Sequence, residues 1–374
     1  MVTGDCQAAD GAVAALAHQS RLEPRPGQGG APCRAARHDL ELPGRSVIEL
    51  LINVALLTML CMTALVVVYV RHLFSVVMLF GIYSLLSALI FVVLDAADVA
   101  FTEAAVGAGV STVFMLATLV STGRQEKAPA HSPLLPLAVV TVTGAALIWG
   151  TLDMPHFGDP GNPVHVHVAD RYIQESPDEI GIPNMVTSVL ASYRGYDTMG
   201  EVIVIFTALV GVLSLLGVRE RRENPVHRTG ERHSRPYPVL QVMALLLIPF
   251  ILVFALYVQF HGDFGPGGGF QAGVIFAAAI ILYTLTFGLD DATALLPVKL
   301  ICMLAAAGVL LYGGTGVVSM LLGGNYLDYD VLAHDPVHGQ HYGILVIELG
   351  VGITVSTVMI AIFLALVSRA ERPR

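Results

Sequence analysis

The sequence predicts an all-α fold, a polytopic membrane helix bundle of about nine transmembrane helices. One observation is composition: the 374 residues are 55% hydrophobic and only 13% charged, with a mean hydropathy of +0.71. A soluble domain is about 25% charged, so lipid must be the solvent for much of this chain. The other observation is that apolar runs long enough to cross about 30 Å of hydrocarbon recur after residue 46.

These runs lie at 47–70, 73–94, 99–121, 134–152, 199–218, 238–260, 269–288, 298–322 and 343–367. Each must be helical, because lipid offers no partner to an unpaired backbone group. Residues 1–45 are rich in Ala, Gly, Pro and Arg without apolar periodicity, which predicts a disordered tail or an over-extended gene start. The basic segment 219–236 reads as a linker between a first membrane unit, 46–218, and a second, 237–374.

The distribution of Lys and Arg predicts the orientation in a cell membrane. With the C-terminus in the cytoplasm, the cytoplasmic connections and end hold 13 of the 20 Lys and Arg residues, and the opposite connections hold two. The other five lie in the N-terminal tail, which this topology puts outside. The acidic connection 153–198 on the outer side could steer cations by its field, although a solvated loop surface explains it as well.

Other kinds of chemistry have little support. The net charge of −9 argues against a nucleic-acid partner. The four cysteines form no CxxC pair, and His165 and His167, two apart in a loop with His156 nearby, are a weak metal signal. We therefore expect neither a metal nor a cofactor, and no catalysis by this chain alone.

Carboxylates inside the apolar runs are the informative residues, because each costs about 2.5–3.5 kcal/mol at a helix centre unless it is paired, hydrated or useful. Glu103 and Glu348 stand among small residues that permit close helix contact. Each could be a proton relay, and for Glu103 a structural hydrogen bond is an equal alternative. Asp98 and Glu201 lie near the predicted helix starts, where a first-turn carboxylate suits the helix dipole.

The sequence HGDFGPGGGFQAG at 261–273 joins two runs by a tight turn. It is not a nucleotide-binding loop, because no Lys-Ser/Thr follows the glycines. Pro266, Gly267 and Gly268 supply the reversal, while Gly269 and Gly273 form a GxxxG face for a neighbouring helix. Asp263 could cap this turn or contact a cation.

Two stretches in the second half, DFGPGGGFQAGVIFAAAIILYTLTFG and IELGVGITVSTVMIAIFLAL, resemble the MrpB subunit of the Mrp-type multisubunit Na⁺/H⁺ antiporters. Two stretches in the first half, DAADVAFTEAAVGAGVSTVFMLATL and IPNMVTSVLASYRGYDTMGEVIVIFTALVGV, resemble the C-terminal part of the MrpA subunit. They are also similar to small subunits of membrane-bound hydrogenases. The chain thus resembles a fusion of the two antiporter subunits.

The resemblance implies work within a hetero-oligomeric complex in the lipid bilayer, with Na⁺ and H⁺ as the transported ions and the main pumping machinery on another polypeptide. By matching position it implies relay roles for Asp98 and Glu103 in DVAxTEAAVG, Glu201 in DTxGE and Glu348 in ELGVG. The alternative is a membrane-arm subunit of a redox-driven complex. A stand-alone channel or a structural spacer is a third possibility.

Overall fold

The computed structural model describes residues 43–370 except 128–131, 133, 157, 158, 160 and 218–237. The predicted linker 219–236 and nearly all of the predicted tail 1–45 lie outside the described residues. The described residues from Asn53 onward belong to one compact unit, and the boundary of this unit lies inside the first long helix. This unit contains residues from both sides of the predicted linker.

Nine helices in the described part of the chain are long and apolar enough to cross a membrane, which confirms the predicted all-α bundle. Eight are α3 (Pro43–Tyr69), α4 (Leu73–Val93), α7 (Leu134–Thr151), α12 (Gly195–Leu216), α13 (Pro238–His261), α14 (Gly269–Phe287), α16 (Val298–Leu321) and α17 (Pro336–Ala370). The ninth is a continuous span made of α5 (Ala97–Glu103), the π-helix η1 (Ala104–Ser111) and α6 (Thr112–Ser121).

Helices α12 and α17 begin earlier than the sequence predicted. Helix α12 starts at Gly195 rather than 199, and α17 starts at Pro336 rather than 343. The first turns of both carry polar residues, so a hydropathy window misses them, although a proline suits the first turn of a helix. Glu201 consequently lies in the second turn of α12, and the prediction that it opens the helix was wrong.

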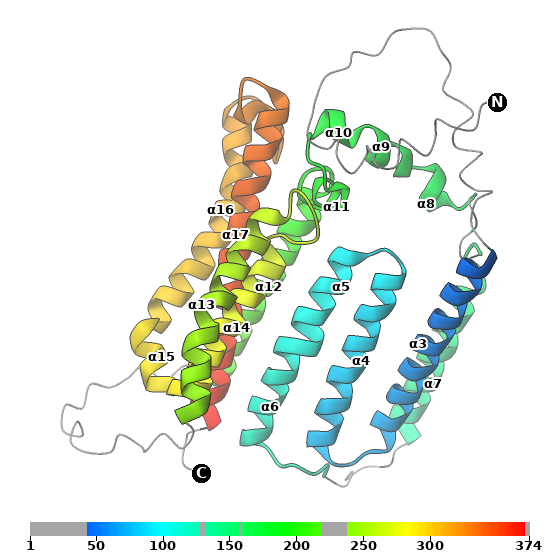
Figure 1. The fold of residues 1–374 in the computed structure, drawn as a ribbon, viewed down its shortest axis with the longest axis vertical. Helices are drawn as coiled ribbons and strands as arrows, with labels where there is room; N and C mark the ends of the chain where they lie inside the picture. Colours follow the sequence, from blue (N-terminus) through cyan, green and yellow to red (C-terminus); the bar gives the residue numbers. More distant parts are fainter. Residues whose placement is uncertain are drawn as a thin grey trace. The chain divides into compact units, whose positions relative to one another are not determined.

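Helix α17 packs against α16, α14, α12 and α6, and Figure 1 shows it among α16, α14 and α12. Glycines permit the closest approaches. A Cβ on Gly269 of α14 would collide with the backbone carbonyl of Glu348, and one on Gly273 would lie 2.8 Å from the carbonyl oxygen of Gly352. These two glycines therefore let α14 and α17 meet backbone to backbone.

The connection before α12 is more structured than a solvated loop. It contains the short helices α8 (Pro163–Val166), α9 (Ala169–Gln174), α10 (Ser176–Glu179) and α11 (Met185–Thr187), then the π-helix η2 (Ser188–Tyr193). Ile180 and Ile182 are buried in the same hydrophobic cluster as Ile344 and Ile347 of α17. The connection therefore folds back onto the bundle, while its acidic side chains include exposed ones such as Asp170 and Asp178.

Two short helices complete the second half. Helix α15 (Leu289–Leu295) follows α14, and the 3₁₀ turn η4 (Tyr329–Leu332) precedes α17. The ring of Tyr329 is fully buried and would collide with any side chain at Gly343. Its hydroxyl donates to the carbonyl oxygen of Ala191 at 3.3 Å, so this tyrosine fixes the first turns of α17 against η2.

Candidate functional site

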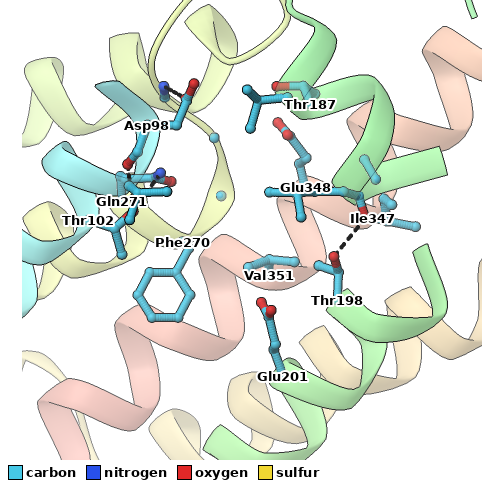
Figure 2. Close-up of a pocket in the computed structure, with 17 residues that line it drawn as sticks. Asp98, Thr102, Thr187, Thr198, Glu201, Phe270, Gln271, Ile347, Glu348 and Val351 are labelled. Carbon is cyan, nitrogen blue, oxygen red and sulfur yellow. Dashed lines mark hydrogen bonds between the residues drawn. The ribbon is translucent and has the colours of Figure 1, made fainter. Parts of the chain in front are cut away.

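A cavity of about 390 Å³ opens between α5, the α11–α12 segment, the turn before α14, and α17 (Figure 2). Three carboxylates line it, each from a different helix: Asp98 from α5, Glu201 from α12 and Glu348 from α17. The other lining residues are Val99, Thr102, Val186, Thr187, Leu190, Ala191, Thr198, Gly267, Gly268, Gly269, Phe270, Gln271, Ile347 and Val351.

Glu348 points at the glycine turn before α14. A Cβ on Gly268 would lie 3.3 Å from Oε1 of Glu348, and a Cβ on Gly262 would lie 3.3 Å from Oε2. Gly268 also has a φ of +123°, which strains any residue with a side chain. The turn thus supplies both the room and the backbone conformation that bring Glu348 to the cavity wall.

Asp98 lies in the first turn of α5, as its helix-end interpretation requires. Its Oδ1 also accepts a hydrogen bond of 3.1 Å from the backbone N–H of Gly267. One turn further along, the side chain of Gln271 donates to Thr102 Oγ1 at 2.9 Å. Two hydrogen bonds therefore join α5 to the beginning of α14 beside the cavity.

Glu201 lines the opposite part of the cavity, below Val351 in Figure 2. Its side chain is exposed, whereas Asp98 and Glu348 are partly buried. Thr198, one turn before it, also lines the cavity and donates to the carbonyl oxygen of Leu190 at 2.7 Å. The three carboxylates therefore differ in solvent exposure, as the residues of a path between the protein interior and solvent must.

Glu103 is not among the residues that line the cavity. It lies where α5 gives way to η1, facing α4: a Cβ on Gly107 would be 2.6 Å from Glu103 Oε1 and 2.7 Å from Ser84 Oγ. Ser84 is buried. The structure thus brings together three of the four predicted relay residues and puts Glu103 in a separate contact between helices.

Two residues from the first half of the sequence form hydrogen bonds with the turn before α14. The side chain of Asn184 donates to the carbonyl oxygens of Gly262 and Gly265, at 2.9 and 3.0 Å. Thr187 Oγ1 donates to the same Gly262 oxygen at 2.7 Å. Sequence reasoning did not identify Asn184 or Thr187, and their separation of more than seventy residues from the turn left no local signal.

Asp263, in the same turn, is buried, and its Oδ2 lies 3.2 Å from Nδ1 of His341 on α17. Burial raises the pKa of the Asp263 carboxyl, while the proximity of His341 opposes that rise. Asp263 was predicted to cap the turn or to contact a cation. Its observed partner is a histidine that sequence reasoning did not single out.

Both π-helical segments adjoin the cavity. η1 begins directly after the α5 residues that line it, and η2 contributes Leu190 and Ala191 to its wall. Such segments occur frequently at functional sites, because the wider turn leaves backbone groups and side chains out of the regular helix pattern. In the described residues, no three His, Cys, Asp or Glu side chains gather closely enough to hold a metal ion.

The fold and this cavity define a polytopic membrane protein with acidic side chains between its spans. Residues 239–361 match the family described as a domain related to the MnhB subunit of Na⁺/H⁺ antiporter. The chain is 33% identical over 131 residues to a putative antiporter subunit, mnhB2, of Staphylococcus haemolyticus, covering 34% of this chain and 92% of that protein. The chain belongs to this MnhB-related family.

The first half matches two other family models, both described as subunits of MBH. Residues 58–124 match the MbhD family, and residues 137–232 match the MbhE family. Asp98 falls in the first match, Asn184, Thr187 and Glu201 in the second, and Glu348 in the MnhB-related segment. The cavity is therefore built by all three family segments of the chain.

Two further proteins are similar to the chain. It is 29% identical over 157 residues to the uncharacterized protein MJ1307 of Methanocaldococcus jannaschii, covering 39% of this chain and 60% of that protein. A structure of the Mrp complex from Dietzia sp. DQ12-45-1b matches with a TM-score of 0.65 and 23% identity, over 96% of this chain and 40% of that chain. The chain thus spans less than two thirds of either protein, and the structural match supports the fold.

Proposed function

We propose that this chain is a membrane subunit of a multisubunit monovalent cation/proton antiporter, with Na⁺ as the first cation to test. Asp98, Glu201 and Glu348 are proposed as residues of its proton or ion path. The observation that carries the proposal is that these carboxylates come from three helices and line one cavity between membrane spans. Carboxylates inside a membrane protein are costly and are retained where they serve ion or proton movement.

The family relationship supports the same proposal. The MnhB-related family is named for a subunit of a Na⁺/H⁺ antiporter, and the Dietzia structure is that of a complex. We infer that the chain works with other subunits, carries no catalytic chemistry of its own, and lies in the cell membrane with its C-terminus in the cytoplasm. The excess of Lys and Arg in the connections of that side supports this orientation.

Glu103 holds a different place in the proposal. Its position beside Ser84 and Gly107 suits a hydrogen bond across the contact between α4 and the third span. We propose that any relay role of Glu103 belongs to a second path, and that Glu348 is the first residue to test.

The test measures cation-dependent proton exchange in everted membrane vesicles from cells that express the whole operon. Wild type is compared with Glu348→Gln at matched complex assembly, and Asp290→Asn serves as a control, because Asp290 is a carboxylate of α15 that does not line the cavity. Loss of exchange in Glu348→Gln with an intact complex is the expected result. Undiminished exchange in that variant would remove Glu348 from the path.

A membrane-arm subunit of a redox-driven complex is the second candidate. The matches of 58–124 and 137–232 to the MbhD and MbhE families favour it. The redox centres would then lie on partner subunits, so the purified complex would contain iron and the vesicles would show no Na⁺-driven proton exchange. An iron-free complex that exchanges Na⁺ for protons excludes this candidate.

A further inference from the structure

A histidine–aspartate pair lies at the turn before α14, whose residues Gly267 and Gly268 line the cavity. His341 Nδ1 is 3.2 Å from Asp263 Oδ2, and the side chain of His341 is 43% exposed while that of Asp263 is 12% exposed. The two residues come from different elements, α17 and the turn before α14. One partner therefore contacts solvent and the other reaches into the protein.

His341 and Glu348 are seven residues apart on α17, so they lie on the same face of the helix, about 10 Å apart along its axis. Helix α17 has 35 residues and is about 52 Å long, whereas the hydrocarbon core is about 30 Å thick. Part of the helix must project from the hydrocarbon. His341, in the second turn, is placed in that projecting part, and Glu348 lies deeper.

Asp263 is next in the chain to a glycine that lies close to Glu348. A Cβ on that glycine, Gly262, would lie 3.3 Å from Oε2 of Glu348. Exposure decreases from His341 to Asp263, and Glu348, seven residues after His341, lines the cavity. This order is the one that a proton-transfer chain from solvent to a membrane carboxylate requires.

We propose that His341 and Asp263 form the outer proton-exchange pair for Glu348, passing protons between the outer aqueous phase and the cavity. The inference rests on the proposed function and adds two residues and a side of access to it. An imidazole suits this task, because histidine ordinarily gains and loses a proton between pH 5 and 8. No bond other than those to the transferred proton is formed or broken.

The other titratable groups around the pair are few. On α17, His338 pairs with Asp335 at 2.7 Å, one turn before His341, and the ring of Tyr342 lies near that of His341. On the other elements, Asp98 faces the same turn from α5, and His261 ends α13 just before Asp263. Among these, His338 offers a matched control, because both members of its pair with Asp335 are exposed.

The test compares His341→Asn, Asp263→Asn and His338→Asn in the vesicles described above, over pH 6–9. Asparagine at 341 retains an N–H group that can donate to Asp263 but cannot carry a proton, so it preserves a structural bond and removes exchange. We expect His341→Asn and Asp263→Asn to lower the exchange rate about tenfold near neutral pH and to flatten its pH profile. His338→Asn should behave as wild type.

A swapped variant, Asp263→His with His341→Asp, restores a titratable pair and should recover exchange above either single variant. Wild-type rate and pH profile in His341→Asn, with exchange abolished in Glu348→Gln, would overturn this inference and leave the proposed function standing. Undiminished exchange in Glu348→Gln, or no exchange in wild type, would overturn the proposed function and this inference with it.

Discussion

The side chain of Asn184 donates a hydrogen bond of 2.9 Å to the carbonyl oxygen of Gly262, 78 residues further along the chain. The backbone N–H of Asn184 donates at 3.0 Å to the carbonyl oxygen of Asp263, the residue that follows Gly262. Asn184 belongs to the segment that matches the MbhE family, and Gly262 belongs to the MnhB-related segment. One residue therefore ties two family segments together beside the cavity.

Asn184→Ala removes both of its side-chain bonds to the turn and leaves the partly buried carbonyl of Gly265 without that donor, while the carbonyl of Gly262 keeps the bond from Thr187. An unsatisfied buried group costs about 1–3 kcal/mol, so we expect a lower melting temperature of the purified complex and a looser turn. Asn325→Ala is the control, because the backbone N–H of Asn325, which bonds Asp328, is unchanged by it. Equal melting temperatures for the two variants would contradict this role of Asn184.

Gly269→Ala places a Cβ against the backbone of α17 at Glu348. The clash can be relieved only by moving α14 and α17 apart. Overpacking of this kind costs about 1–3 kcal/mol. We expect reduced assembly of the complex, measured by co-purification of its subunits. Gly314→Ala in α16 is the matched control, because nothing lies within 4 Å of its Cβ position. Normal assembly of Gly269→Ala would show that α14 and α17 tolerate separation.

The connection before α12 contains a titratable group of three residues. Arg171 pairs with Glu179 at 2.8 Å, and the hydroxyl of Tyr193 donates to the same carboxylate. The bond from Tyr193, then that from Arg171, lowers the pKa of Glu179 below its ordinary 4.5. Burial, then the bond to Glu179, raises the pKa of Tyr193 to about 12.

These shifts predict the pH range in which the connection is stable. The contribution of Glu179 is present above its ordinary pKa of about 4.5 and is lost as the pH falls through its lower folded value. That of Tyr193 is present below its ordinary pKa of about 10 and is lost as the pH rises through about 12. Amide hydrogen exchange over residues 169–194 should therefore be slowest, after correction for intrinsic rates, between about pH 5 and 10.

Variants separate the two ends of that range. Tyr193→Phe should lose the alkaline transition, because it has no hydroxyl to ionise. Glu179→Gln should lose the acid transition and weaken protection at neutral pH, because the pair with Arg171 is gone. If both variants show the wild-type pH dependence of protection, Glu179 and Tyr193 are not the groups that set the two ends of the range.

Glu103→Gln and Glu348→Gln should differ in effect. Glu103 lies near Ser84 outside the cavity lining, where glutamine can also form a hydrogen bond, so we expect cation-dependent exchange to fall less than about twofold. Glu348 lines the cavity, where glutamine cannot carry a proton, so we expect exchange to fall at least about tenfold. Exchange rates measured on vesicles with equal amounts of assembled complex test this order, and the reverse order would place the main path at Glu103.

Much of the fold could be predicted from the sequence. Lipid imposes helices on every apolar run, so composition and run length were enough to predict the nine spans now found in the described residues. The glycine-rich turn was predictable as a turn, because Pro266 and its glycines have strong local preferences. The starts of α12 and α17 were not, because their polar first turns are held by packing rather than by lipid.

Only the tertiary structure decided which of the candidate carboxylates line the cavity. The sequence singled out Glu103 and Glu348 by the cost of charge in a membrane, and the family resemblance added Asp98 and Glu201, but neither indicates which of the four lie together. Which of them meet depends on the crossing of α5, α12 and α17, which is fixed by contacts such as Gly269 against Glu348 and Asn184 against Gly262. Such contacts join residues more than seventy positions apart, and no local pattern encodes them. The sequence by itself therefore determined the membrane fold and the candidate carboxylates, whereas packing alone decided that Glu348 shares a cavity with two of them and that His341 meets Asp263 beside it.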